Sequence, residues 1–398
     1  MSKSLNFIDL FAGCGGMSEG FYRMGYNALA HVEIDPTCCK TLKKRMDYYE
    51  YPNSENSILN VDITREDILD CIDNVIKNQS VDVIIGGPPC QAYSTLGRAK
   101  DENGMKNDPR NYLFESYVKV LNHYLPKYFV FENVTGILTA TVGENKIIDL
   151  VFKELSKEYK VIFDPQINTL NSVHYGVPQL RKRVIIIGVR KDLDVNPQDI
   201  YSSIIKTHYS PDDTEAEKLN KKKYITVRDA LEELPFLYPG EGERFVLFDY
   251  NLDNEFLRRI GTKKLPILMD HVARNHNEID RKRYREMAKN EWTFKELLEN
   301  REDLRHEKAR VFNNSYTVQW WDLPSKTIIA HLYKDGNQFI HPDYNQERTF
   351  TVREAARIQS FPDDFVFMGP RTEQYKQIGN AVPPLLAEAI AKAMKRFL

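Results

Sequence analysis

The sequence predicts an α/β fold with a doubly wound, mostly parallel sheet and a second, smaller domain. Short apolar, β-branched runs alternate with helical patterns as far as about residue 190, which is typical of strand–helix–strand units. Charge density then rises, and proline and glycine are scattered from 191 to 345, which indicates a separate module. Amphipathic patterns return at 351–359 and 384–398, so we expect the tail to close back onto the first domain.

The individual elements follow from where each apolar pattern begins and ends. Compact runs rich in Val, Ile, Phe and Tyr predict strands at 6–10, 28–34, 81–85, 128–132, 160–168 and 183–189. Apolar residues at three- and four-residue spacing predict helices at 17–24, 36–46, 65–77, 113–124 and 145–159. The strongly polar stretch 277–301 is also predicted to be helical. The predicted domains are therefore 1–190 and 191–345, with 346–398 completing the first.

Composition excludes several classes of protein. With 398 residues, 42% of them hydrophobic, the chain can bury a substantial core. The five cysteines lack Cys-x-x-Cys spacing and the N-terminus lacks a secretory pattern, so we expect reduced thiols, a cytoplasmic protein and no metal site. The apolar runs are too short to span a bilayer, so no membrane role is expected. A net charge of -2 gives no overall nucleic-acid signature.

A glycine-rich turn follows the first predicted strand and opens a helix. Glycines such as Gly13 and Gly15 permit positive φ and close approach of a ligand to the backbone. The turn alone is weak evidence, because a plain tight connection has the same composition. Glu33 ends the second strand about 20 residues later, where an acid can bind ribose hydroxyls, and Asp62 follows the third. Together these features favour a nucleoside cofactor.

The sharpest motif is Gly-Gly-Pro-Pro-Cys-Gln at 86–91. The apolar strand 81–85 leads to Cys90 at its carboxyl end, where open α/β sheets build active sites. Most free thiols are buried core residues, but this one follows two prolines outside the strand. The polar segment through 110 is long enough to act as a lid. Cys90 is therefore the candidate nucleophile.

With these motifs the chain resembles the cytosine-C5 DNA methyltransferase family, nearly end to end outside 191–320. The Pro-Pro-Cys-Gln element resembles that family's nucleophile motif, and Glu-Asn-Val at 132–134 resembles its catalytic glutamate motif. Gln-Leu-Arg-Lys-Arg at 179–183 resembles its Gln-x-Arg-x-Arg, and 377–384 resembles its closing motif. The block 348–365 resembles one that supports the second domain.

The resemblance implies a bacterial modification enzyme with a Rossmann-like, S-adenosylmethionine-dependent methyltransferase fold. Residues 1–190 would bind the cofactor and catalyse, 191–345 would recognise the DNA target, and 346–398 would complete the catalytic domain. The implied reaction is methylation of carbon 5 of cytosine within a specific short double-stranded sequence, through a covalent Cys90 adduct on a flipped-out base. Such an enzyme is a DNA (cytosine-5-)-methyltransferase, expected in a restriction–modification system.

Roles for individual residues follow from the same resemblance. The Cys90 thiolate would add to carbon 6, and Glu132 would supply a hydrogen bond or proton at N3. Arg183 would contact O2 or position Glu132, and Arg181 would contact the cysteine loop or the flipped nucleotide. The implied cofactor contacts are Phe11, Gly13, Gly15, Glu33, Ile34, Asp62, Pro88, Leu113, Asn380 and Val382.

Three other interpretations remain open. A tRNA-methylating branch shares the fold and chemistry but usually carries a Cys-Phe-Thr element, which this sequence lacks. A catalytically silent DNA-binding regulator would be expected to have lost the nucleophile, the glutamate or the arginines. A nucleotide-dependent oxidoreductase would leave Pro-Pro-Cys-Gln without a role. The expected partners are double-stranded DNA and a cognate restriction endonuclease, and the expected oligomeric state is a monomer.

Overall fold

A computed structural model describes residues 5–51, 53–89, 113–142, 144–249, 254–261, 266–305 and 316–398. The predicted nucleophile Cys90 and the predicted lid through 110 lie outside these residues. Contacts divide the chain into two compact units. Unit 1 comprises Met1–Asn171, Lys182–Ile205 and Pro384–Leu398, and unit 2 comprises Ser172–Arg181 and Lys206–Pro383. This division groups 346–383 with unit 2, and the predicted domains 1–190, 191–345 and 346–398 stay a prediction.

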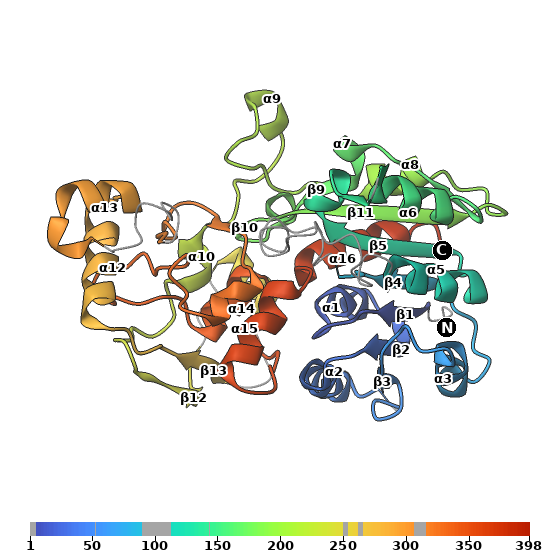
Figure 1. Cartoon of the computed structure of the whole chain (residues 1–398), viewed down its shortest axis with the longest axis horizontal. Helices are drawn as coiled ribbons and strands as arrows, with labels where there is room; N and C mark the ends of the chain where they lie inside the picture. Colours follow the sequence, from blue (N-terminus) through green and yellow to red (C-terminus); the bar gives the residue numbers. More distant parts are fainter. Residues whose placement is uncertain are drawn as a thin grey trace. The chain divides into compact units, whose positions relative to one another are not determined.

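Unit 1 is built on an eight-stranded sheet in the order β3-β2-β1-β4-β5-β11-β8, with β9 also paired to β11 (Figure 1). The strands are β1 (Asn6–Leu10), β2 (Asn27–Glu33), β3 (Ile58–Asn60), β4 (Val83–Gly86), β5 (Tyr128–Val134), β8 (Tyr159–Val161), β9 (Thr169–Asn171) and β11 (Lys182–Arg190). The pairs among β1 to β5 are parallel, whereas β11 runs antiparallel to β5, β8 and β9. The predicted mostly parallel, doubly wound sheet is confirmed.

Helices of unit 1 supply the apolar faces that bury the sheet. They are α1 (Gly16–Arg23), α2 (Pro36–Tyr48), α3 (Ile68–Ile76), α5 (Leu113–Tyr124), α6 (Ile147–Leu155), α7 (Pro165–Asn168), α8 (Pro197–Ser203) and α16 (Pro384–Met394). Smaller elements are the 3-10 helix η2 (Thr135–Leu138) and the hairpin of β6 (Thr141–Val142) with β7 (Asn145–Lys146). The C-terminal helix α16 packs on α1, where a methyl group at Gly20 would lie 2.3 Å from the Glu388 amide nitrogen. The Tyr26 hydroxyl also donates to the Ala391 carbonyl at 3.1 Å.

One predicted strand is wrong. The sequence predicts a single strand over 160–168, but the chain forms β8, then the short helix α7, then β9. The break occurs because the Asp164 carboxylate accepts a hydrogen bond from the Gln166 amide at 2.8 Å and Pro165 takes the first helical position. A proline there lacks only an N–H that would have had no helical partner.

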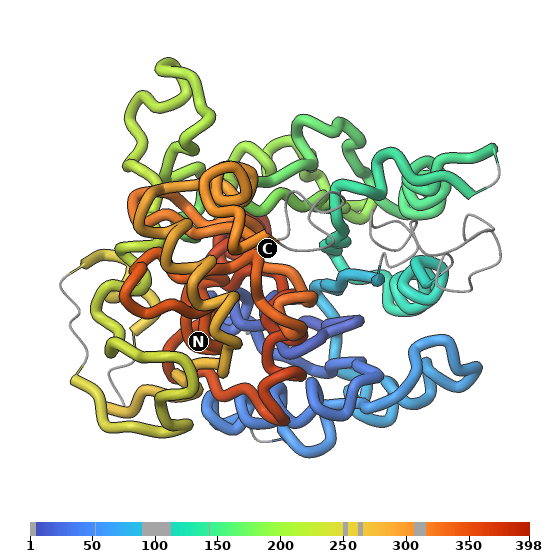
Figure 2. Tube along the Cα trace, turned by 60° about the vertical axis from the view of Figure 1, so that its left-hand side comes forward, coloured from blue at the N-terminus to red at the C-terminus, as the bar shows by residue number. Residues whose placement is uncertain are grey.

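In its described residues, unit 2 consists of short helices and two small strand pairs. Its helices are η3 (Ser172–Tyr175), α9 (Glu215–Lys218), α10 (Val227–Leu231), α11 (Glu255–Ile260), α12 (Glu278–Asn290), α13 (Phe294–Asn300), η4 (Glu302–Leu304), η5 (Ala330–Tyr333), α14 (Val352–Ile358) and α15 (Arg371–Asn380). The pairs are parallel β10 (Gln179–Leu180) with β14 (Ser325–Lys326), and antiparallel β12 (Gly242–Leu247) with β13 (Ile267–Val272). The loop that carries α9 projects in both views (Figures 1 and 2).

Candidate active site

The turn that leads to Cys90 begins at the carboxyl end of β4. Gly87 and the buried Pro88 follow the strand, and the Asn133 side-chain amide donates to the Pro88 carbonyl at 3.1 Å. Asn133 is itself 4% exposed and lies on the neighbouring strand β5. The residues that precede the predicted nucleophile are therefore held by a buried hydrogen bond from the next strand of the sheet.

Glu132 and Arg183 form an ion pair beside this turn. Arg183 Nε lies 3.0 Å from Glu132 Oε1, and the two side chains are only 13% and 14% exposed. The pair forms because β11 runs antiparallel to β5, with Arg183 opposite Val134 and Ile185 opposite Glu132. Burial lowers the pKa of the Arg183 guanidinium, and the Glu132 carboxylate opposes that shift. A carboxylate oriented by one guanidinium can present its other oxygen to a bound ring.

Glu132 also lies against Gly87. A methyl group placed on Gly87 would be 2.6 Å from Glu132 Oε2, well inside van der Waals contact. The glycine thus leaves room for the carboxylate immediately before Pro88. This role of Gly87 was not predicted from the sequence, although a Gly-Gly pair before two prolines is a signal of close backbone approach.

Arg181 lies in a different environment. Its side chain is 1% exposed, and its guanidinium donates to the carbonyls of Ile328 at 2.7 Å, Gly379 at 3.1 Å and Ala381 at 2.9 Å. These backbone partners all belong to unit 2, and the predicted contact of Arg181 with the cysteine loop or the flipped nucleotide stays a prediction. The cysteine loop lies outside the described residues.

The glycine turn after β1 has the backbone that its composition predicts. Gly13 and Gly15 have φ of 54° and 90°, and Phe11 also adopts a positive φ of 58°. Glu33 holds the turn, because its carboxylate accepts hydrogen bonds from the Gly13 amide at 2.7 Å and the Asp35 amide at 2.8 Å. Burial raises the pKa of Glu33, and these two backbone amides oppose that shift. The structure therefore brings Gly13 and Glu33 together.

The remaining predicted cofactor contacts lie in several parts of the chain and differ in exposure. The Ile34 side chain is 63% exposed, and Leu113 is half-buried at the start of α5. Asp62 is exposed and accepts from the amide and hydroxyl of Thr64 at 2.9 and 2.8 Å, which is the role of a turn-forming carboxylate. Two further predicted contacts belong to unit 2, where Asn380 is exposed and Val382 is buried.

A buried acid that was not predicted as a site residue lies on β1, the strand that precedes the glycine turn. Asp9, on β1, is 1% exposed and accepts a hydrogen bond from the Ser18 hydroxyl of α1 at 2.5 Å. Burial raises the pKa of Asp9 from 3.8 to about 8. An acidic residue within an otherwise apolar strand was the available signal.

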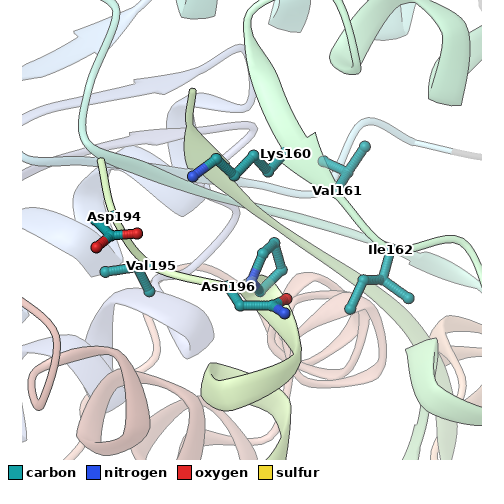
Figure 3. A pocket seen from close by; sticks show the side chains of 7 residues that line it. Lys160, Val161, Ile162, Asp194, Val195 and Asn196 are labelled. Atoms are coloured by element: carbon teal, nitrogen blue, oxygen red, sulfur yellow. The ribbon is translucent and has the colours of Figure 1, made fainter. Parts of the chain in front are cut away.

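A cavity of about 370 Å³ opens between residues 160–162, at the end of β8, and residues 194–197 (Figure 3). Its lining includes none of the predicted site residues, so it is not the candidate active site. In the described part of the chain, no cluster of His, Cys, Asp and Glu side chains is arranged to hold a metal ion. Within the same residues, no helix is both long and apolar enough to cross a membrane.

Comparison with known proteins gives matches over nearly the whole chain. Residues 5–396 match the family model of C-5 cytosine-specific DNA methylases. The type II methyltransferase M.Bpa9945I of Bacillus paralicheniformis is 34% identical, with 98% of each chain covered. The type II methyltransferase M.DdeI of Desulfomicrobium norvegicum is 36% identical over 99% of this chain and 89% of its own length.

Solved structures show the same similarity in three dimensions. A putative DNA modification methyltransferase encoded within an E. coli prophage superposes with a TM-score of 0.69 at 25% identity, covering 99% of both chains. The S. pombe Dnmt2 methyltransferase, at 16% identity and a TM-score of 0.55, covers 98% of this chain and 99% of its own and shares the fold.

Proposed function

The chain belongs to the family of C-5 cytosine-specific DNA methylases and is accordingly a DNA (cytosine-5-)-methyltransferase, and we propose that it modifies one short double-stranded sequence as part of a restriction–modification system. Its methyl donor is S-adenosylmethionine, and its nucleophile is Cys90. Two relatives named as type II methyltransferases, similar over nearly their full lengths, support the proposal.

The observation that carries the proposal is the Glu132–Arg183 pair beside Gly87. Family membership alone does not require these side chains to meet, yet Arg183 Nε and Glu132 Oε1 lie 3.0 Å apart, and Glu132 lies beside Gly87, three residues before Cys90 in the sequence. One of the two roles predicted for Arg183, positioning Glu132, needs this geometry. We assign the pair to the recognition of the cytosine ring edge that carries N3 and O2.

Residues of unit 1 fit a nucleoside cofactor. A methyl group on Gly13 would meet no heavy atom within 4 Å, so the backbone there is open to a ligand. Glu33 accepts one bond on each carboxylate oxygen from the backbone, and each oxygen retains capacity for a ribose hydroxyl. The exposed Ile34 side chain offers an apolar surface for an adenine ring. Bound S-adenosylmethionine supplies an electrophilic methyl group.

The protein's own groups activate the cytosine. The Cys90 thiolate forms a bond to carbon 6, and the electron pair of the 5,6 double bond becomes available at carbon 5. In its protonated form, the Glu132 carboxyl donates a hydrogen bond or proton at N3, which absorbs the charge that develops on the ring. Arg183 keeps the Glu132 carboxyl in place. After methylation, loss of the carbon-5 proton regenerates the double bond and expels the Cys90 thiolate.

Reaching carbon 6 requires the target base to leave the helix. Unstacking and unpairing cost a few kcal/mol, and contacts to the DNA must offset this cost. We assign those contacts to the region 191–345, which lies mostly in unit 2. A single flipped base occupies a single active site, so a monomer suffices. A restriction endonuclease that cleaves the same sequence is the expected partner.

The test is transfer of label from tritiated S-adenosylmethionine to mixed-sequence duplex DNA and, separately, to total tRNA. We expect label in DNA as 5-methylcytosine, lost in Cys90→Ser and retained in Cys71→Ser, a matched change at a half-buried thiol of α3. Label only in tRNA would overturn the substrate, and retained activity in Cys90→Ser would overturn the nucleophile. Cofactor binding without transfer to either nucleic acid would favour a silent regulator.

A further inference from the structure

The loop of unit 2 that carries α9 projects in both views, and its two ends lie side by side (Figures 1 and 2). We call these ends, residues 206–209 and 221–224, the α9 stem. The Tyr209 amide donates to the Lys222 carbonyl at 2.9 Å, and the Lys222 amide donates to the Thr207 carbonyl at 3.0 Å. Backbone hydrogen bonds therefore hold the two halves of the stem together.

The stem is also anchored on His174 of η3. The His174 carbonyl accepts from the amides of residues 207 and 208 at 2.9 and 3.1 Å. Burial lowers the pKa of His174, and the Asp213 carboxylate opposes that shift. The Lys206 and Lys221 ammonium groups lower this pKa further. Two lysines from opposite ends of the loop therefore lie close enough to act on the same imidazole ring.

Positive and negative side chains are segregated along this loop. The stem contains four lysines and no acid, whereas every acid of 206–224 lies between 212 and 217. Carboxylates of that acidic tip bind groups of the loop itself. Glu215 lies 2.7 Å from Lys218 Nζ, and Glu217 closes the capping box at the start of α9. The stem is thus a cationic surface distinct from the tip.

Three of the four stem lysines have no acid to pair with. Lys222 Nζ lies 2.6 Å from a carboxylate oxygen of Glu255. Among the residues that the structure describes, no carboxylate pairs with Lys206, Lys221 or Lys223. The side chains of Lys206 and Lys223 are exposed, and that of Lys221 is half-buried. Unpaired ammonium groups on a fixed backbone create a local positive potential that attracts a polyanion, although the net charge of the chain is -2.

Two tyrosines of the stem add neutral hydrogen-bond donors. The rings of Tyr209 and Tyr224 lie 5.8 Å apart at an angle of 88°, and the Lys223 ammonium lies 5.1 Å from the centre of the Tyr224 ring. Both tyrosines are half-buried, and neither hydroxyl has a hydrogen-bond partner in the described part of the chain. Lysine and tyrosine side chains are among those that contact DNA phosphates.

The composition of the stem fits phosphate groups better than base edges. The stem lacks arginine, asparagine and glutamine, the planar side chains that bind base edges through two hydrogen bonds at once. Ammonium groups act on phosphate as point charges and impose little geometry. Duplex DNA presents about one such charge per 1.7 Å of its axis. A rigid cationic stem can therefore bind the backbone of any duplex sequence.

We propose that the α9 stem binds the phosphate backbone of the DNA substrate through Lys206, Lys221 and Lys223, without reading its sequence. This rests on the proposed function, in which the region 191–345 contacts duplex DNA. The stem supplies affinity, and other residues of that region supply sequence recognition. Each phosphate contact releases condensed counterions, so binding through the stem has a defined salt dependence.

The test is the Kd of duplex DNA, measured by fluorescence anisotropy on the full chain over a series of salt concentrations. The stem variant replaces Lys206, Lys221 and Lys223 by glutamine. Because each phosphate contact contributes about 0.9 to the slope of log Kd against log salt, the slope should fall by about 2 to 3. The positions methylated in mixed-sequence DNA, read by bisulfite sequencing, should stay the same, since phosphate contacts carry no sequence information.

The charge-matched control replaces Lys44, Lys77 and Lys153 by glutamine. These lysines of unit 1 are also exposed, and in the described residues none of them pairs with a carboxylate. The control changes the net charge by the same amount and should leave the slope unchanged. Arginine at the three stem positions keeps the charge and should retain the slope. Melting temperatures measured in parallel show that each variant is folded.

An unchanged slope in the stem variant, an equal fall in the control, or a changed set of methylated positions would each overturn the inference. A slope that also falls in the arginine variant would overturn it, because the charge would then not be what binds. Failure of the proposed function is recognised separately, as absence of methyl transfer to DNA by the unmodified protein, since the slope is measured without methyl transfer.

Discussion

Replacing Gly87 by alanine tests the geometry of the active site directly. The added methyl group would lie 2.6 Å from Glu132 Oε2, whereas ordinary contact begins at 3.4 Å. The carboxylate must therefore move by about 0.8 Å, and misplacement of about 1 Å at a reacting group costs about 10²-fold in rate. The displaced atom is the end of a flexible side chain, so the free energy of unfolding should change little. We expect kcat to fall about 10²-fold without a shift in Tm.

The assay is single-turnover methyl transfer to duplex DNA, with Tm measured in parallel. Repeating the substitution in a Glu132→Ala background separates a displaced carboxylate from a disturbed cysteine turn. With the carboxylate gone, Gly87→Ala should have no further effect, so the double variant should match Glu132→Ala. Wild-type activity in Gly87→Ala, or a second loss of rate in the double variant, would refute the reasoning.

Three further predictions follow from described contacts. Arg183→Lys should lower kcat by about 10²–10³-fold in the same assay, because an ammonium cannot reproduce the planar guanidinium, and an unchanged rate would remove Arg183 from the mechanism. Since the pKa of Asp9 rises from 3.8 to about 8 on folding, the folded protein binds more protons within that window, and the free energy of unfolding should fall as pH rises through it. Asp9→Asn should remove this part of the slope in urea titrations, and an unaltered slope would contradict the assignment. Gly20→Ala should cost about 1–3 kcal/mol in the same titrations because its methyl group would meet backbone of α16, and unchanged stability would mean that α16 can shift.

Local patterns predicted much of the fold. The strand at 6–10 and the helix at 113–124 were predicted with the bounds that the structure gives them, because their apolar spacing is unambiguous over a few residues. The break at Asp164 and Pro165 was missed, since the flanking apolar residues gave a stronger signal than one capping side chain. The direction of β11 was not predictable from its own residues, because strand direction depends on the partner.

The residues of the candidate site were predictable from the sequence, but the contacts between them were not. Glu132 and Arg183 were named from motifs that resemble a family, and their roles remain predictions, although the structure places them in contact. Two contacts join residues that no local pattern connects. Gly87 leaves space for the Glu132 carboxylate, and the Gln359 side-chain amide donates to the Ala381 carbonyl just after α15. Such contacts depend on which strands and helices become neighbours, so they appear only once the fold is known.

The pairing of α16 with α1 has a consequence for how the protein is made. The two helices pack together, but residues 24–383, which include most of unit 2, separate them in the sequence. At translation rates of about 5–20 residues per second, the ribosome needs on the order of 20 to 70 seconds to synthesise the intervening chain. During this interval, the face of α1 that α16 covers in the folded protein has no helix packed against it. The nascent chain therefore exposes an apolar helix surface that chaperones can bind, and stop codons introduced before α16 should trap this form.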